Sequence, residues 1–112
     1  MLGGIDLKKH NQVWTAVTPH LHNKLKEYAT DNNLAATRAK MVMYILYNYR
    51  PKELLEDYNF RSEDGKTISI KVSDDELKYI ENLAGEYGVT ISRLLRSMVY
   101  TYFLEKDVIK TV

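Results

Sequence analysis

The chain of 112 residues repeats one pattern, and each copy alone is too short to enclose a hydrophobic core. Residues 12–50 and 67–104 each contain a short alternating stretch, an amphipathic stretch with helical spacing, a turn and a second apolar stretch. We therefore expect the copies to pair within a single domain, residues 1–112. The first motif would cover residues 10–50, a linker residues 51–65, and the second motif residues 66–105.

The second copy has the clearer pattern. Residues 67–72 alternate polar and apolar side chains, which is typical of a half-buried strand. Ser73 follows as a helix N-cap, and Glu76 has the spacing of a capping box. The helix that they begin should end at Gly88, and Thr90 should cap a second, more apolar helix. The apolar strand face would consist of Ile68, Ile70 and Val72.

The first copy matches the second at an offset of 55 residues through its first helix. Thr18 takes the cap position, and Asn32 and Asn33 replace the glycine at the helix end. The turn then carries two extra residues, because the apolar pattern realigns at an offset of 53, where Thr37 matches Thr90. The buried strand face would consist of Val13, Thr15 and Val17.

The linker begins at Pro51, which ends the preceding helix because proline has no amide proton. Residues 53–58 are compatible with one or two helical turns, and residues 62–65 predict a polar turn. Fully extended, the linker would span roughly 50 Å at about 3.3 Å per residue. It is therefore long enough to return the chain so that the second strand lies beside the first.

The order strand, helix, helix with these caps resembles the ribbon-helix-helix family, to which Arc and MetJ belong. The second copy carries the resemblance in residues 68–73 and 88–96, and the first copy in residues 17–21. The matches cover about two-thirds of the chain. The resemblance implies a mainly α fold with a short β ribbon. In it, two ribbon-helix-helix motifs would pair within one chain as an intramolecular pseudo-dimer.

The resemblance also implies a function. Family members insert an antiparallel ribbon into the DNA major groove and hold the backbone with the starts of their second helices. We therefore expect a sequence-specific DNA-binding transcription regulator that binds double-stranded DNA, with two or another even number of chains on the operator. The tandem form is similar to the paired regulators of archaeal filamentous viruses. That similarity implies a viral protein acting in the host cytoplasm.

The pleat of the two strands assigns the candidate base contacts. If the apolar side chains face the helices, the opposite face is free to meet DNA, where glutamine suits adenine and lysine suits guanine. Serine and threonine can contact several bases, and tryptophan and alanine offer apolar contacts to a thymine methyl group. The alternatives are a merely solvated ribbon and, for Trp14, a ring folded against the N-terminal arm. The six candidates are Gln12, Trp14, Ala16, Thr67, Ser69 and Lys71.

Candidate phosphate contacts lie at the starts of the two second helices, where free backbone amides and the helix dipole favour anions. They are Thr37, Arg38 and Lys40 in the first copy, and Thr90, Ser92 and Arg93 in the second. Lys8 and Lys9 precede the first strand and would form a basic arm, unless this segment is a mobile tail. For the two threonines, the alternative is helix capping alone.

The charge distribution suits a local DNA-binding face better than a wholly basic surface. The net charge is only +1, but residues 1–50 carry +4 and residues 51–112 carry −3. The acidic residues cluster in the linker and at the start of the helix after Ser73, which leaves basic residues around the ribbon.

Several other classes of protein are not indicated. The absence of cysteine favours an intracellular protein without disulfides, and no apolar run reaches the roughly 18 residues of a membrane span. His20 and His22 are two apart on a predicted helix and face different directions, so they make a poor metal pair. We find no phosphate loop, nucleophile motif or paired acids, and therefore expect no catalytic site and no cofactor.

Two alternatives stay open. A helix-turn-helix protein would place Ser92, Arg93 and Arg96 on a recognition helix. A protein-binding module, like an antitoxin or adaptor, would instead use the apolar groups of the linker, which are Leu54, Leu55, Tyr58 and Phe60.

Overall fold

The computed structural model describes residues 11–110, and these form four helices and one two-stranded sheet. The predicted fold class, mainly α with a short β ribbon, is confirmed at this level. In chain order the elements are β1 (Asn11–Val17), α1 (Pro19–Asp31), α2 (Arg38–Asn48), the short 3-10 helix η2 (Ser62–Asp64), β2 (Lys66–Val72), α3 (Asp74–Tyr87) and α4 (Ile91–Glu105).

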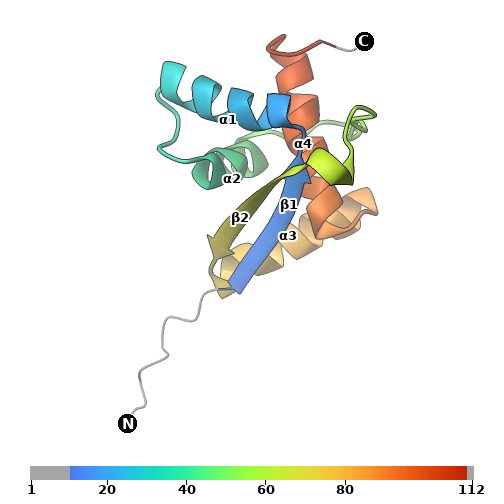
Figure 1. Cartoon of the computed structure of the whole chain (residues 1–112). Coiled ribbons are helices and arrows are strands. Elements are labelled where there is room, and N and C mark those ends of the chain that lie inside the picture. Colours follow the sequence, from blue (N-terminus) through green and yellow to red (C-terminus); the bar gives the residue numbers. More distant parts are fainter. Residues whose placement is uncertain (1–10, 111–112) are drawn as a thin grey trace.

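The two strands form an antiparallel ribbon although about 50 residues separate them in the sequence (Figure 1). Trp14 lies opposite Ser69 at the middle of the ribbon. The predicted alternation is confirmed, because one side of each strand is buried and the other faces solvent. The buried strand residues are Val13, Thr15, Val17, Ile68, Ile70 and Val72.

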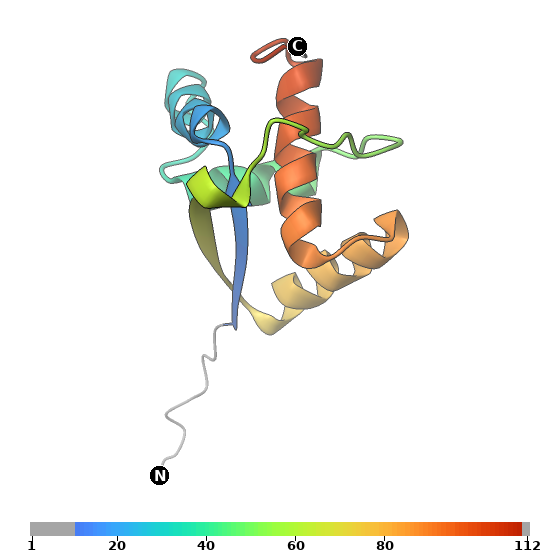
Figure 2. The same ribbon diagram turned by 45° about the vertical axis from the view of Figure 1, so that its right-hand side comes forward.

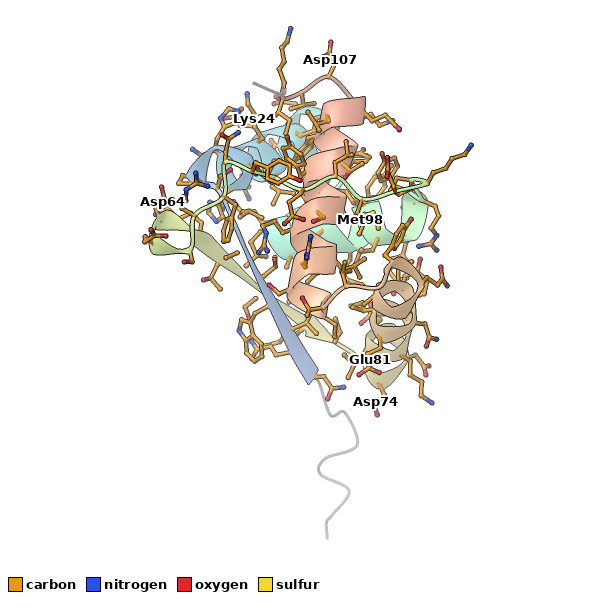
Figure 3. All side chains as sticks on the ribbon, turned by 90° about the vertical axis from the view of Figure 1, so that its right-hand side faces the viewer. Lys24, Asp64, Asp74, Glu81, Met98 and Asp107 are labelled. Carbon is orange, nitrogen blue, oxygen red and sulfur yellow. The ribbon has the colours of Figure 1, made fainter. Side chains whose placement is uncertain are left out.

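The helices cover the buried face of the ribbon and enclose one core. α4 packs against β1, and α2 packs against β2. These two helices also contact each other, while α1 packs on α2 and α3 packs on α4. Met98 of α4 is fully buried, and Figure 3 places it midway along this helix. Asp64 and Asp74 mark opposite ends of the ribbon in the same view.

The two turns between helices use the same backbone device. Asn33 and Gly88 both adopt left-handed conformations, with φ of 54° and 69°. The amide of the next residue then donates to a carbonyl five residues earlier, over 2.9 Å from Leu34 to Ala29 and 3.0 Å from Val89 to Ala84. Asparagine replaces glycine here because it tolerates this conformation better than most residues. The extra residues of the first turn therefore follow Leu34.

The helix starts agree with the predicted caps. The side chains of Thr18, Thr37, Ser73 and Thr90 each accept a hydrogen bond from a backbone amide in the first turn of the helix that follows. Ser73 and Glu76 form the full capping box.

The helical turns with which residues 53–58 are compatible do not form, because this part of the linker is irregular. The Leu55 amide donates to Thr101 Oγ1 of α4 over 2.8 Å, and Asp57 Oδ1 accepts from the Asn59 amide over 3.0 Å. The first bond holds the linker against α4, and the second stabilises a local turn within the linker. The polar turn expected at residues 62–65 contains the 3-10 helix η2.

Gly85 and Gly88 allow a matched test of the turn. A Cβ atom at either position would meet nothing within 4 Å, so only the backbone distinguishes the two glycines. We expect Gly88→Ala to lower the free energy of unfolding by about 1–2 kcal/mol, because its φ is positive. Gly85→Ala, inside α3, should raise it by about 0.5–1 kcal/mol. Urea denaturation measures both changes, and equal shifts in the same direction would contradict this explanation.

Candidate nucleic-acid interface

All six predicted base contacts lie on one side of the ribbon, opposite the core. We call this set the exposed ribbon face: Gln12, Trp14, Ala16, Thr67, Ser69 and Lys71. Gln12 lies opposite Lys71, and Ala16 lies opposite Thr67. Five of the six are exposed, and the Trp14 side chain has 53% of its surface in solvent. The alternative that Trp14 folds against the N-terminal arm concerns residues outside the described part of the chain.

One hydrogen bond fixes part of this face. Gln12 Nε2 donates to Ser69 Oγ over 2.8 Å. As an acceptor in this bond, the Ser69 hydroxyl keeps its own proton for another partner. Gln12 has a second amide N–H and its carbonyl oxygen besides this bond, and these are the two groups that would bond an adenine edge. The two side chains therefore act as a pair across the strands.

The linker residue Phe60 lies beside the exposed ribbon face at Ala16, and the sequence did not predict this contact. Ala16 is half-buried, and the Phe60 ring lies close to it beside Gly65. A Cβ atom on Gly65 would come within 2.9 Å of Phe60 and 3.3 Å of the Ala16 Cβ atom, so this glycine permits the close approach. Arg96 completes the cluster, because its Nη1 donates to the Ala16 carbonyl over 3.2 Å and its Cζ lies 4.2 Å from the Phe60 ring centre.

The start of α2 flanks the ribbon on the β2 side. We call Thr37, Arg38 and Lys40 the α2 flank. A groove of about 600 Å³ separates this flank from the ribbon, and its lining includes Gln12, Lys40 and Lys71. Two lysines thus border one groove, although Glu76 also lines it.

Arg38 points to a different partner. Its Nε donates to the His22 carbonyl over 2.8 Å, which joins the start of α2 to α1. Burial lowers the pKa of His22, and the positive charges of Arg38 and Lys66 lower it further. Both effects favour the neutral imidazole, so His22 contributes less positive charge to this flank. Lys40 is the residue of the α2 flank best placed for an anion in the groove.

The start of α4 flanks the ribbon on the β1 side. We call Thr90, Ser92 and Arg93 the α4 flank. Thr15 is buried in β1, and its hydroxyl donates to the Ser92 carbonyl over 2.7 Å. This bond fixes the position of the first turn of α4 along β1.

Arg93 forms an ion pair within the chain, which the sequence did not predict. Its Nη2 and Nε lie 2.6 Å and 3.0 Å from Glu56 Oε1 in the linker. Within residues 11–110 the other ion pair joins Lys24 to Glu27, so Lys40 and Lys71 have no acidic partner there. The two flanks therefore differ in charge, although both begin with a threonine cap.

The remaining predictions concern the arm and other kinds of site. Lys8 and Lys9 lie outside the described residues. Within residues 11–110, no group of three or more histidine or acidic side chains is arranged to hold a metal ion. None of the helices in this part of the chain has the length and apolar character needed to cross a membrane.

Comparisons with known proteins leave the geometry as the basis for assigning a function. No protein-family model matches the chain, and neither curated proteins nor solved structures have a significant similarity to it.

Proposed function

We propose that this chain is a sequence-specific DNA-binding transcription regulator that places its ribbon in the major groove. One observation carries the proposal: the ribbon buries one face under the helices and presents polar and aromatic side chains on the other. The major groove is about 12 Å wide and admits a two-stranded ribbon. Gln12 and Lys71 would read base edges at one end, and Trp14 would make an apolar contact at the centre.

In this proposal the two copies are ribbon-helix-helix motifs that pair within one chain. The packing supports it, because the second helix of each copy lies against the strand of the other. The register supports it as well. Trp14 lies opposite Ser69, and these residues are equivalent at the offset of 55, as a two-fold axis through the ribbon centre requires. Each copy then completes the core of the other.

The two copies would make the DNA site asymmetric. Gln12, Trp14 and Ala16 on one strand face different residue types on the other, so a single chain would recognise a non-palindromic half-site. Lys40 would hold one phosphate strand beside the α2 flank, next to the base contact of Lys71. A palindrome in the operator would then reflect two chains and not two copies.

The chain provides its own reporter of DNA binding, because Trp14 is its one tryptophan. Duplex DNA should shift the Trp14 emission to shorter wavelength and protect it from acrylamide, since the exposed ring would leave water. The logarithm of the binding constant should fall linearly with the logarithm of salt concentration, with a slope of about −0.9 per phosphate contacted. Fluorescence titration at several salt concentrations measures both effects. Unchanged emission together with no binding at low salt would refute the proposal.

A second test separates the ribbon from a helix-turn-helix. After selection of a preferred site from random duplexes, Lys71→Ala should reduce discrimination at one base pair by about 1–3 kcal/mol. Arg96→Ala should leave the base preference intact, because Arg96 bonds the Ala16 carbonyl and packs on Phe60. The opposite result would assign base contact to α4. The burial of nine α4 residues argues against that alternative, since a recognition helix needs an exposed face.

A third test concerns assembly. One ribbon covers only a short site, so we expect an even number of chains on the operator. Native mass spectrometry of the complex should detect two or four chains per duplex. Single chains at saturating protein would contradict this expectation while leaving DNA binding itself intact.

A protein-binding role is the second candidate. It is favoured by the exposure of Tyr58 (81%) and Leu55 (40%) in the linker. In that role the linker would bind a protein partner and the ribbon would have weak or no affinity for DNA. The salt titration discriminates the two, because phosphate contacts require affinity that falls steeply with salt.

A further inference from the structure

The linker crosses α4 (Figure 2). Two of its side chains contact the two arginines of that helix. Glu56 pairs with Arg93, and Phe60 packs on Arg96, four residues further along the linker. Arg93 and Arg96, in successive turns of α4, thus both have partners within the chain. On the α2 flank, Lys40 has no such partner in residues 11–110.

Fixed contacts on both sides of Glu56 hold it in position. On one side, the Leu55 amide donates to the buried Thr101 hydroxyl over 2.8 Å. On the other side, Asp57 is buried and its carboxylate caps the Asn59 amide. At the beginning of the linker, the Pro51 carbonyl accepts a hydrogen bond from the hydroxyl of Tyr87, the last residue of α3. The linker backbone on both sides of Glu56 is therefore held in place, which keeps the Glu56 side chain within reach of Arg93.

The pair occupies the side chain that would otherwise meet a phosphate. Arg93 lies in the first turn of α4, where the helix dipole and the guanidinium both favour an anion. A guanidinium binds carboxylate and phosphate in the same planar geometry, so the two anions compete. The pair is only partly buried, with 52% of the Arg93 side chain and 32% of the Glu56 side chain exposed, so it can open.

We propose that the Glu56 carboxylate competes with DNA phosphate for Arg93. While the ion pair is formed, Arg93 would not contact the DNA backbone. This inference rests on the proposed function. The chain would first bind DNA through the α2 flank, where Lys40 and Lys71 border the open groove. Arg93 would engage the backbone only after Glu56 releases it. The two flanks would therefore contact DNA in order, the α2 flank first and the α4 flank after the ion pair has opened.

The test replaces the carboxylate while preserving its shape. Glu56→Gln should bind the selected duplex about two- to fivefold more tightly, because an exposed pair of this kind holds its partner weakly. Its salt dependence should steepen by about 0.9, as expected for one additional phosphate contact. Glu53→Gln is the matched control, because Glu53 lies in the same linker and forms no ion pair within residues 11–110. It should have a smaller effect on both quantities.

Arg93→Gln completes the comparison. It should lower the affinity of the unmodified chain less than it lowers the affinity of the Glu56→Gln variant, and it should abolish the gain produced by Glu56→Gln. Equal gains from Glu56→Gln and Glu53→Gln would assign the effect to net charge and overturn the proposed competition. A Glu56→Gln variant that binds like the unmodified chain would also overturn it, while leaving the DNA-binding proposal standing. No binding by any variant at low salt would overturn both.

Discussion

The pairing of β1 with β2 is the interaction on which the rest of this structure depends. Each strand has one buried face, and the ribbon joins both faces into one surface. The helices then bury that surface, at about 1.5–3 kcal/mol for each large aliphatic side chain. Because the strands are antiparallel, α1 and α3 begin at opposite ends of the ribbon. The helices α2 and α4 pack on the two strands and contact each other.

The same pairing creates the exposed ribbon face as a consequence of the pleat. Side chains that do not enter the core must point away from it, so six residues from two distant segments gather on one side. Their chemistry is free to differ between the strands, because the core restricts only the alternate positions. Trp14 can thus lie opposite Ser69 without any cost to packing below. The unequal flanks add a second asymmetry, since Glu56 neutralises Arg93 while Lys40 borders an open groove.

Much of the fold was predictable because the relevant signals are local. The strand alternation, the threonine and serine caps and the left-handed turn at Gly88 each depend on residues within one or two turns of the chain. The linker was predicted less well. Its spacing of Leu54, Leu55 and Tyr58 resembles a helical turn, yet Leu55 donates its amide to Thr101, 46 residues away. Such a bond leaves no trace in local propensity.

By itself the sequence determined which side chains of each strand face the core, where each helix begins, and which residues share the exposed ribbon face. It did so because the two-residue and 3.6-residue periods convert directly into directions in space. The tertiary structure alone decided the contacts between distant segments. Phe60 lies beside Ala16, Gln12 donates a hydrogen bond to Ser69 across the strands, and Glu56 forms an ion pair with Arg93. The Gln12 bond depends on the register of the two strands, and the Phe60 and Glu56 contacts depend on how the linker folds back over α4. No local pattern specifies either of these arrangements.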